Sequence, residues 1–346
     1  MIYLLIVSIG LFGWLVMRKI KAPAPALLGP MIFVGIASIG GFNFPHLPQV
    51  SVSIFQLIIG IFVGMRITRG QFQLLKRRTV LYSFILILIW TVGSSLVAAN
   101  VLLTLTDLDV ATALLAGTPG GLTEMSVVAF AYGADVPTVA LLQLLRLTFI
   151  VSFIPFLSLS IKKKNGGYTE KIKDKKDVIE EVVKRKVSVE IIGTGLIVGV
   201  LLMYLNFPAG GLIGAIIGVG GSSIILNKSA YLPKSVQLIA QIGIGISIGL
   251  RFTQETFQQF SRLIGPMIIL PLFMVLSGVL LAIIIKNITK WDLSTCLLCS
   301  APAGLSQMII VAEEIESDVF LVSLFQTTRL LAIYLILPQI FNWYLR

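Results

Sequence analysis

The chain has 346 residues, of which 56% are hydrophobic and only 12% are charged, and its formal net charge is +11. Soluble domains carry about 25% charged residues, and a soluble protein of this length could not bury so much apolar surface. The composition therefore excludes a soluble enzyme, a disordered chain and a nucleic-acid-binding protein, and it favours a polytopic membrane protein.

Apolar segments close to membrane-spanning length follow one another along the chain. In the first half they cover 2–17, 25–43, 51–65, 79–104, 110–133 and 137–161. In the second half they cover 188–206, 208–226, 235–250, 263–285, 293–312 and 319–343. The stretch between the halves is rich in both basic and acidic residues. We therefore predict a first membrane repeat at 1–161, a charged cytoplasmic linker at 162–187 and a second membrane repeat at 188–346.

Two motifs occur in both halves, in the same order. Residues 112–125 align with 295–308 at an offset of 183, and residues 56–68 align with 241–253 at an offset of 185. The offset of 183 also pairs three later polar residues with their counterparts: Asp135 with Asp318, Gln143 with Gln326 and Arg146 with Arg329. Chance similarity of apolar segments would not align Pro, Gly, Gln, Asp and Arg, so the pattern indicates a duplication.

The fifth apolar segment of each half is interrupted at the same place. Thr118-Pro119-Gly120-Gly121 lies within the first, and Ala301-Pro302-Ala303-Gly304 lies within the second. Proline removes a backbone donor and glycine weakens a helix, so we expect a break at both positions. Each segment either crosses the membrane as a broken helix or returns to its own side as a re-entrant hairpin.

The distribution of Lys and Arg distinguishes these alternatives. If both broken segments return and the N-terminus is outside, 22 of the 27 Lys/Arg residues lie on the inside. If both segments cross, the better orientation leaves only 15 inside. The positive-inside rule therefore favours two inverted repeats. We predict an all-α integral membrane protein with about five transmembrane helices per repeat, a Pro/Gly-broken or re-entrant helical hairpin in each repeat, both termini outside and the linker in the cytoplasm.

Inverted repeats with broken helices are typical of secondary transporters. A break exposes helix N-termini that favour anions and carbonyl groups that hold Na⁺ or proton-bearing groups. We expect ligands around both breaks: Thr118, Pro119, Gly120, Gly121, Thr123 and Glu124 in the first half, and Pro302, Gly304, Ser306 and Gln307 in the second. A charge at this depth costs at least about 2.5–3.5 kcal/mol, so Glu124 is interpreted as a cation ligand or proton carrier, with helix capping as the alternative.

Two arginines lie about ten residues into otherwise apolar helices. Arg146 and Arg329 each follow a glutamine by three residues, and those glutamines, Gln143 and Gln326, share the same helix face. Guanidinium groups pair well with carboxylate or phosphate, so both pairs are candidates for binding an anionic substrate. The alternative is a structural salt bridge to an acidic side chain: Asp109, Glu124 or Asp292. Asp135 and Asp318 precede the last helix of each half and are expected to cap it.

Histidine and cysteine are too few for a redox metalloenzyme. The single histidine, His46, lies in a short loop, and the pair Cys296 and Cys299 lies inside an apolar segment without a second pair. Structural zinc sites need four ligands, so we expect these cysteines to be small core residues. We predict a protein that is not an enzyme and has no resident metal or cofactor, with Na⁺ or H⁺ as the only coupling ion.

The repeated motifs resemble those of the AbrB-type membrane duplication family, a family of bacterial inner-membrane proteins. The resemblance rests on Thr118–Met125, Gly133–Asp135 and Gln143–Leu147, with their copies at 301–308 and 318–330, and it covers essentially the whole chain. Members are often labelled transcriptional regulators or ammonia monooxygenases. This chain offers no DNA-binding segment and one histidine, so neither label is expected to apply.

The resemblance extends to carriers with inverted five-helix repeats, in which an elevator-like core moves against a scaffold. By that analogy the first two spans of each half form the scaffold, the last three elements form the core, and a homodimer is expected. We predict a secondary active transporter of a small anionic metabolite in the plasma membrane. The alternative is a membrane sensor or regulator that keeps a carrier fold without transport. The expected partners are a small-molecule substrate and the lipid bilayer.

Overall fold

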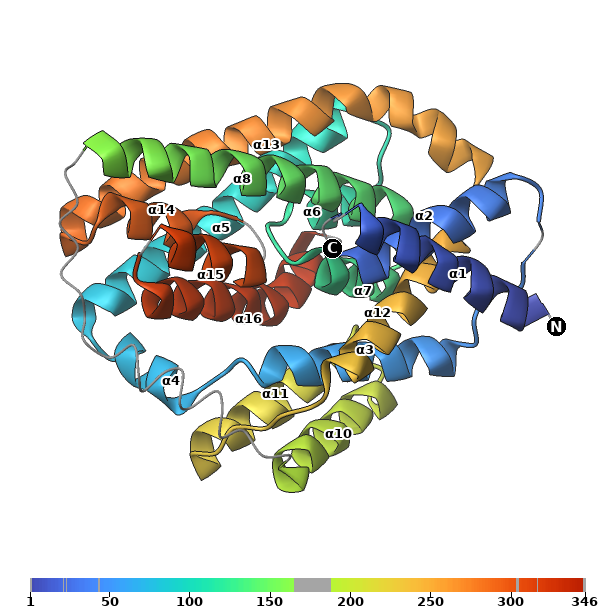
Figure 1. Cartoon of the computed structure of the whole chain (residues 1–346), viewed down its shortest axis with the longest axis horizontal. Coiled ribbons are helices and arrows are strands. Elements are labelled where there is room, and N and C mark those ends of the chain that lie inside the picture. Colours follow the sequence, from blue (N-terminus) through green and yellow to red (C-terminus); the bar gives the residue numbers. More distant parts are fainter. Residues whose placement is uncertain are drawn as a thin grey trace.

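The computed structural model describes residues 2–20, 22, 24–42, 44–164, 188–302, 305–315 and 317–344. Within these ranges the regular secondary structure is helical (Figure 1). The expected linker, 162–187, lies almost wholly outside the described residues, so its place and the domain boundaries that depend on it stay predictions.

The helices follow the expected apolar segments closely. The first half contains α1 (Ile2–Lys19), α2 (Pro25–Ile39), α3 (Gln49–Gly64), α4 (Arg69–Leu75), α5 (Arg78–Leu105), α6 (Val110–Gly117), α7 (Leu122–Ala131) and α8 (Val136–Lys164). The second half contains α10 (Val189–Tyr204), α11 (Gly210–Leu226), α12 (Lys234–Gly249), α13 (Gln254–Thr289), α14 (Leu293–Ser300), α15 (Leu305–Glu314) and α16 (Val319–Tyr344). The fifth apolar segment of each half is broken where proline and glycine predict it.

Two helical stretches lie outside the apolar segments. Helix α4 forms in a basic loop because Thr68 and Gln71 make a capping box, in which each side chain bonds the other's backbone N–H. Helix α13 begins at Gln254, nine residues before the apolar segment that starts at 263. Its first turns are polar in sequence, so the apolar segment does not include them. Hydrophobicity alone detects neither stretch.

The helices form two groups that each draw on both halves of the chain. In the first group, α1 packs on α2 and α10 on α11, while α2 also packs on α12 and α3 on α11. In the second group, α5, α6 and α8 lie with α13, α14 and α16, and each broken segment packs on its neighbours (Figure 1). The first group occupies the lower and right parts of Figure 1, and the second the left and upper parts. One hydrophobic core connects the two groups.

Glycine permits the close crossings within the first group. A Cβ at Gly60 of α3 would collide with the carbonyl oxygen of Leu212 in α11, and a Cβ at Gly245 of α12 would collide with the carbonyl oxygen of Leu27 in α2. Gly60 and Gly245 are counterparts in the aligned motifs. The G-x-x-x-G pairs therefore serve helix packing, as their spacing predicts.

Apolar side chains cover the outer surface of the long helices. On α13 an exposed stripe recurs every fourth residue: Ile264, Ile268, Leu272, Leu276, Leu280, Ile284 and Ile288. On α5 the stripe includes Leu81, Ile85 and Ile89, at positions that align with those of α13. A continuous exposed stripe of this length suits contact with lipid and not with water.

Three helices in the described part of the chain are long and apolar enough to cross a membrane: Ile2–Lys19, Arg78–Leu105 and Leu263–Thr289. A fourth is added if Gln49–Gly64 and Arg69–Leu75, which are bent by 58°, form one span. Several other apolar helices are shorter. These helices are consistent with a membrane protein, and the number of crossings stays a prediction.

Candidate functional site

Both broken segments double back to the end at which they began. The backbone N–H of Asp135, just after α7, donates to the hydroxyl of Thr112 in the first turn of α6 at 2.8 Å. The equivalent bond in the second half joins the N–H of Asp318 to the hydroxyl of Thr295 at 3.2 Å. A segment that continued in one direction over 23 residues could not bring its ends together in this way. Each segment is therefore a hairpin.

Aspartate side chains fix the ends of these hairpins. Asp109 accepts from the backbone N–H of Thr112 at 2.9 Å and so caps α6, while Asp292 caps α14. Asp318 accepts from the N–H of Leu321 at 2.9 Å, and Asp135 accepts from the hydroxyl of Thr138 at 2.6 Å. Both therefore bond the first turn of the helix that follows, as expected of caps. Burial raises the pKa of Asp135 above its ordinary value, although the bond from Thr138 opposes that shift.

The first break, Thr118–Gly121, leaves carbonyl groups without helical partners. Pro119 has no N–H, so the carbonyl of Leu115, four residues earlier, lacks its usual donor. The side-chain amide of Gln143 on α8 takes that place, donating to Leu115 O at 2.7 Å and to Thr118 O at 2.9 Å. Gln143 thus supplies the hydrogen bond that Pro119 withholds.

Arg146 completes the same end of α6. Its Nη1 donates to Thr118 O at 2.8 Å and its Nη2 to Gly120 O at 2.9 Å, while Gln143 accepts a further bond from Nη2. The residue is only 3% exposed. A cation at the negative end of a helix is electrostatically favourable. The guanidinium therefore stabilises the carbonyl groups that the break leaves free.

The second break, residues 301–304, is held in the same way. Pro302 withholds a donor from Leu298, and the amide of Gln326 donates to Leu298 O at 2.7 Å and to Ala301 O at 3.0 Å. Arg329, 1% exposed, donates to Ala301 O at 2.7 Å and bonds Gln326. Each half therefore has a buried arginine that bonds the backbone carbonyl groups of its own break.

Glu124 lies at the other side of the first break, in the first turn of α7. Its carboxylate folds over Gly121, where a Cβ would collide with it, and Glu124 remains partly exposed. Among the described residues no hydrogen bond or ion pair joins its carboxylate to Arg146. Glu124 therefore lies beside the break, as the sequence predicts, but not among the partners of Arg146.

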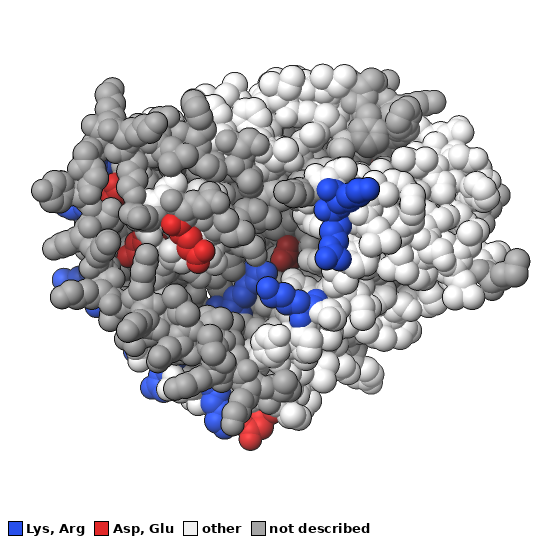
Figure 2. Space-filling view, in the orientation of Figure 1, with Lys and Arg blue, Asp and Glu red and all other residues white. Residues whose placement is uncertain are grey.

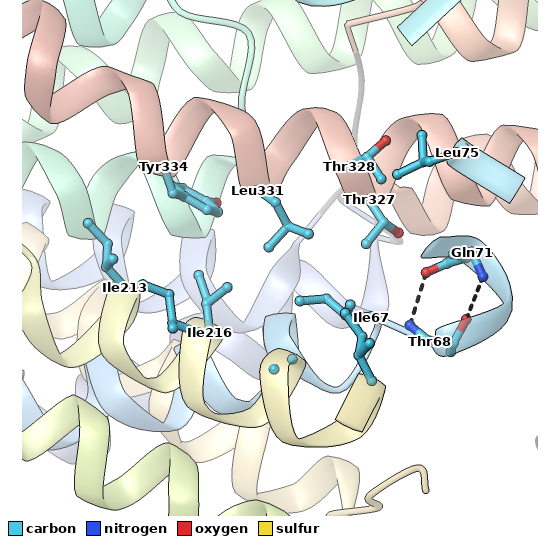
Figure 3. Close-up of a pocket in the computed structure, with 14 residues that line it drawn as sticks. Ile67, Thr68, Gln71, Leu75, Ile213, Ile216, Thr327, Thr328, Leu331 and Tyr334 are labelled. Carbon is cyan, nitrogen blue, oxygen red and sulfur yellow. Dashed lines mark hydrogen bonds between the residues drawn. The ribbon is translucent and has the colours of Figure 1, made fainter. Parts of the chain in front are cut away.

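A cavity of about 280 Å³ reaches Tyr334 between the two helix groups. Its walls are α11 on one side and α16 on the other, and the loop before α4 closes one end (Figure 3). Apolar side chains dominate the lining, among them Ile213, Ile216 and Leu331. Figure 2 shows basic side chains around a hollow in one face of the molecule, with an acidic side chain recessed within it.

A second hollow, of about 430 Å³, lies beside the turn that ends the first hairpin. Asp135 and Pro137 line it together with His46 from the loop before α3 and Arg251 from the end of α12. The Arg251 guanidinium stacks 3.7 Å above the ring of Phe130 in α7. Three loops, those before α3, before α8 and after α12, therefore meet at this hollow.

Comparison with known proteins identifies the family. The family described as transition state regulatory protein AbrB matches residues 1–162 and 79–345. The chain belongs to the AbrB family. It is 27% identical to a proposed regulator, AbrB, of Escherichia coli (strain K12) over 97% of this chain and 92% of that protein. It is 24% identical to YhjN of Bacillus subtilis (strain 168), a protein of uncharacterized function, over 95% of this chain and 86% of that protein.

In this AbrB-family protein most of the expected site residues lie at the two breaks. Gln143, Arg146, Gln326 and Arg329 hold the breaks, and Thr118, Gly120, Gly121 and Glu124 lie at the first break. Thr123 is buried in α7, and the Thr118 hydroxyl bonds the carbonyl of Leu114 in its own helix. Gly304 and the side chains of Ser306 and Gln307 lie outside the described residues.

The arginines have a role that neither sequence alternative included. Arg146 donates to backbone carbonyl groups at the break and not to the carboxylate of Asp109 or Glu124. Asp109 and Asp292 cap helices. Cys296 and Cys299 are fully buried core residues without a disulfide, as expected.

Sequence reasoning did not single out Tyr334, which lines the cavity, or Arg66, which precedes the lining residue Ile67. Arg66 is part of the aligned motif that also contains Arg251, so the repeat itself held a signal for it. Tyr334 lies eight residues after Gln326, about two helical turns, and the apolar character of that segment concealed it.

Proposed function

We propose that this AbrB-family protein is a secondary active transporter of a small organic anion, with alternating access of the elevator type. The observation that carries the proposal is a broken hairpin in each half, held by a buried arginine, in a helix group that borders a cavity shared with the other group. A helix break inside a membrane protein must be buried or line a watery cavity. Such breaks lie at substrate and ion sites in transporters built from inverted repeats.

The inverted arrangement is supported by where the loops lie. Hairpins that return to their own side give each half an odd number of crossings, which inverts the second half relative to the first. The loops of His46, Asp135 and Arg251 all belong outside in that topology, and they line one hollow. Gln71 and Ser323 both belong inside, and their side chains are 3.4 Å apart. If the hairpins crossed, Asp135 would be on the opposite side from His46.

The two helix groups supply the scaffold and the mobile core of this proposal. The first group, with its glycine-mediated crossings, is the scaffold, and it includes the third helix of each half as well as the first two. The second group carries both breaks and both arginines and is the core. The cavity between α11 and α16 separates the groups and belongs to the inner side in this topology, so the described conformation faces inward.

Proton coupling is favoured over Na⁺ coupling. The carbonyl groups exposed at the first break already accept bonds from Gln143 and Arg146, and a guanidinium beside them would repel Na⁺. Glu124 is a partly exposed carboxylic acid beside the break, in the first turn of α7. It is therefore the proposed carrier of the proton.

The function is tested by counterflow in proteoliposomes that contain the purified protein. The probe is hexane-1-sulfonate, which stays anionic across the useful pH range, loaded inside and supplied as a tracer outside. Trans-stimulated uptake that responds to a pH gradient and not to a Na⁺ gradient is expected. Protein that binds the probe without any counterflow would replace the transporter with a sensor, the role closer to the regulator names that the family and its Escherichia coli relative carry.

Cysteine labelling tests the inverted topology. Asp107 and Lys290 occupy equivalent positions of the two halves, at the offset of 183, and both are exposed. In intact cells a membrane-impermeant maleimide should label Asp107→Cys, whereas Lys290→Cys should react only after permeabilisation. The unaltered chain is the control, because its two cysteines are buried. Labelling of both variants from the same side would contradict inversion.

A further inference from the structure

The side chains that line the cavity between α11 and α16 indicate what kind of ligand it binds. Its long walls are formed by isoleucine and leucine, including Ile213, Ile216, Ile224 and Leu331. Hydroxyl-bearing residues of α16 lie along the same wall, and Figure 3 places Tyr334 at the end opposite Thr68 and Gln71. Such a lining suits a molecule with an apolar body and a polar group.

Two hydroxyl groups of this cavity have no hydrogen-bond partner in the described chain. They are Thr327 Oγ1 and Tyr334 Oη, and both residues are only 2% exposed. The other polar residues that line the cavity are satisfied: Thr68 and Gln71 bond each other, and Thr328 donates to Leu324 O at 2.7 Å. Burying a hydroxyl without a partner is unfavourable, so the two free hydroxyls indicate a ligand that bonds them.

Basic residues beside the cavity indicate the sign of its ligand. Arg66 directly precedes the lining residue Ile67, and Arg69 directly follows the lining residue Thr68. The free hydroxyls can donate to an anionic group that these basic residues attract. Further basic residues lie close to Arg66 in the chain: Lys76, Arg77 and Arg78. They would raise the local concentration of anions at the entrance.

We propose that this cavity binds a small organic anion with an apolar body, with Thr327 and Tyr334 as hydrogen-bond donors to its polar group and the isoleucines of α11 around its hydrocarbon part. None of the residues expected from the sequence to bind substrate lines this cavity. The inference names the substrate class of the proposed transporter and rests on that function. Binding can nevertheless be measured without any flux.

Thermal stabilisation and calorimetric binding of the purified chain in nanodiscs test the ligand class. Hexane-1-sulfonate should bind, whereas methanesulfonate, which lacks the apolar body, and hexyltrimethylammonium, which has the opposite charge, should not. Equal binding of methanesulfonate would contradict the apolar part of the proposal. Equal binding of the cation, or no binding of hexane-1-sulfonate, would overturn the anion assignment.

Two substitutions test the assigned donors against a matched control. Thr327→Val and Tyr334→Phe each remove a free hydroxyl at nearly constant shape, and each should weaken hexane-1-sulfonate binding about tenfold. Thr328 lines the same cavity, but its hydroxyl is already bonded within its helix. The Thr328→Val variant should therefore bind hexane-1-sulfonate about as tightly as the parent. If Thr327→Val and Tyr334→Phe bind as tightly as Thr328→Val, the ligand does not occupy this cavity. If the three variants bind as expected but the parent shows no counterflow, transport is refuted while the binding site is retained.

Discussion

Glu124→Gln is expected to abolish accumulation of hexane-1-sulfonate driven by a pH gradient while leaving anion exchange intact. Glutamine has the shape of a protonated glutamate but carries no exchangeable charge, so the variant is held in the proton-loaded form. With one proton per monovalent anion, a gradient of one pH unit supports about tenfold accumulation in the parent. The variant should equilibrate the probe without accumulating it.

The measurement compares tracer accumulation and counterflow in the same proteoliposomes. The fold should tolerate the change, since Gln307 stands at the equivalent position of the second half. Glu313→Gln is the matched control, because Glu313 is an exposed carboxylate on α15 and its loss should leave accumulation unchanged. Accumulation that persists in Glu124→Gln would exclude Glu124 as the proton carrier and reopen the question of the coupling ion.

The same variant separates the charge effect from the fold by its affinity. Glu124→Gln removes a negative charge from the first turn of α7, so hexane-1-sulfonate should bind to it at least as tightly as to the parent. The probe stays anionic, so a change in affinity reports on the protein.

Runs of apolar residues predicted the helices because a membrane-type helix is encoded locally. Apart from the start of α13, the helices begin and end within a few residues of the expected apolar segments, and both Pro/Gly interruptions break the helix where backbone donors are lost. Helix α4 was missed because its stability comes from the Thr68–Gln71 capping box, a pattern that hydrophobicity does not register. The number of membrane crossings depends on how the shorter apolar helices lie in the lipid, and the sequence of apolar residues does not determine that.

The sequence pointed to the residues around the two breaks but not to their hydrogen bonds. The repeat pointed to Gln143, Arg146, Gln326 and Arg329, since polar residues persist there in both copies. A search for charge partners favoured carboxylates or substrate for the arginines. Their partners are backbone carbonyls that the prolines leave free, and carbonyl groups carry no signal in the side-chain sequence. Every residue has one, so only the fold shows which lack a donor.

Tyr334 and Thr327 illustrate a second limit. Both belong to a largely apolar helix, and their hydroxyls matter because α16 turns that face toward α11 across a cavity. The opposite face of the same helix carries Gln326 and Arg329 toward the second break. One helix therefore serves both the break and the cavity, and it offers a mechanical link between them.

The pairing of Pro119 with Gln143 leads to the second large effect. Gln143→Leu should destabilise the protein by about 1–3 kcal/mol, because Leu115 O then has no donor from either the side chain or residue 119. Pro119→Ala restores an N–H at residue 119, so it should recover about 1 kcal/mol of that loss in the double variant. Unfolding of the four proteins in detergent, followed by tryptophan fluorescence, measures the coupling.

The duplication supplies the control for this double-mutant cycle. Gln326→Leu with Pro302→Ala should show a coupling of the same sign, because Gln326 donates to Leu298 O in the equivalent geometry. The crossed pairs, Gln143→Leu with Pro302→Ala and Gln326→Leu with Pro119→Ala, share no carbonyl and should be additive within about 0.5 kcal/mol. Equal coupling in matched and crossed pairs would mean that the glutamines stabilise the core generally. Coupling confined to the matched pairs would establish that each glutamine replaces the donor that its own proline lacks, so that the breaks are built features of both hairpins.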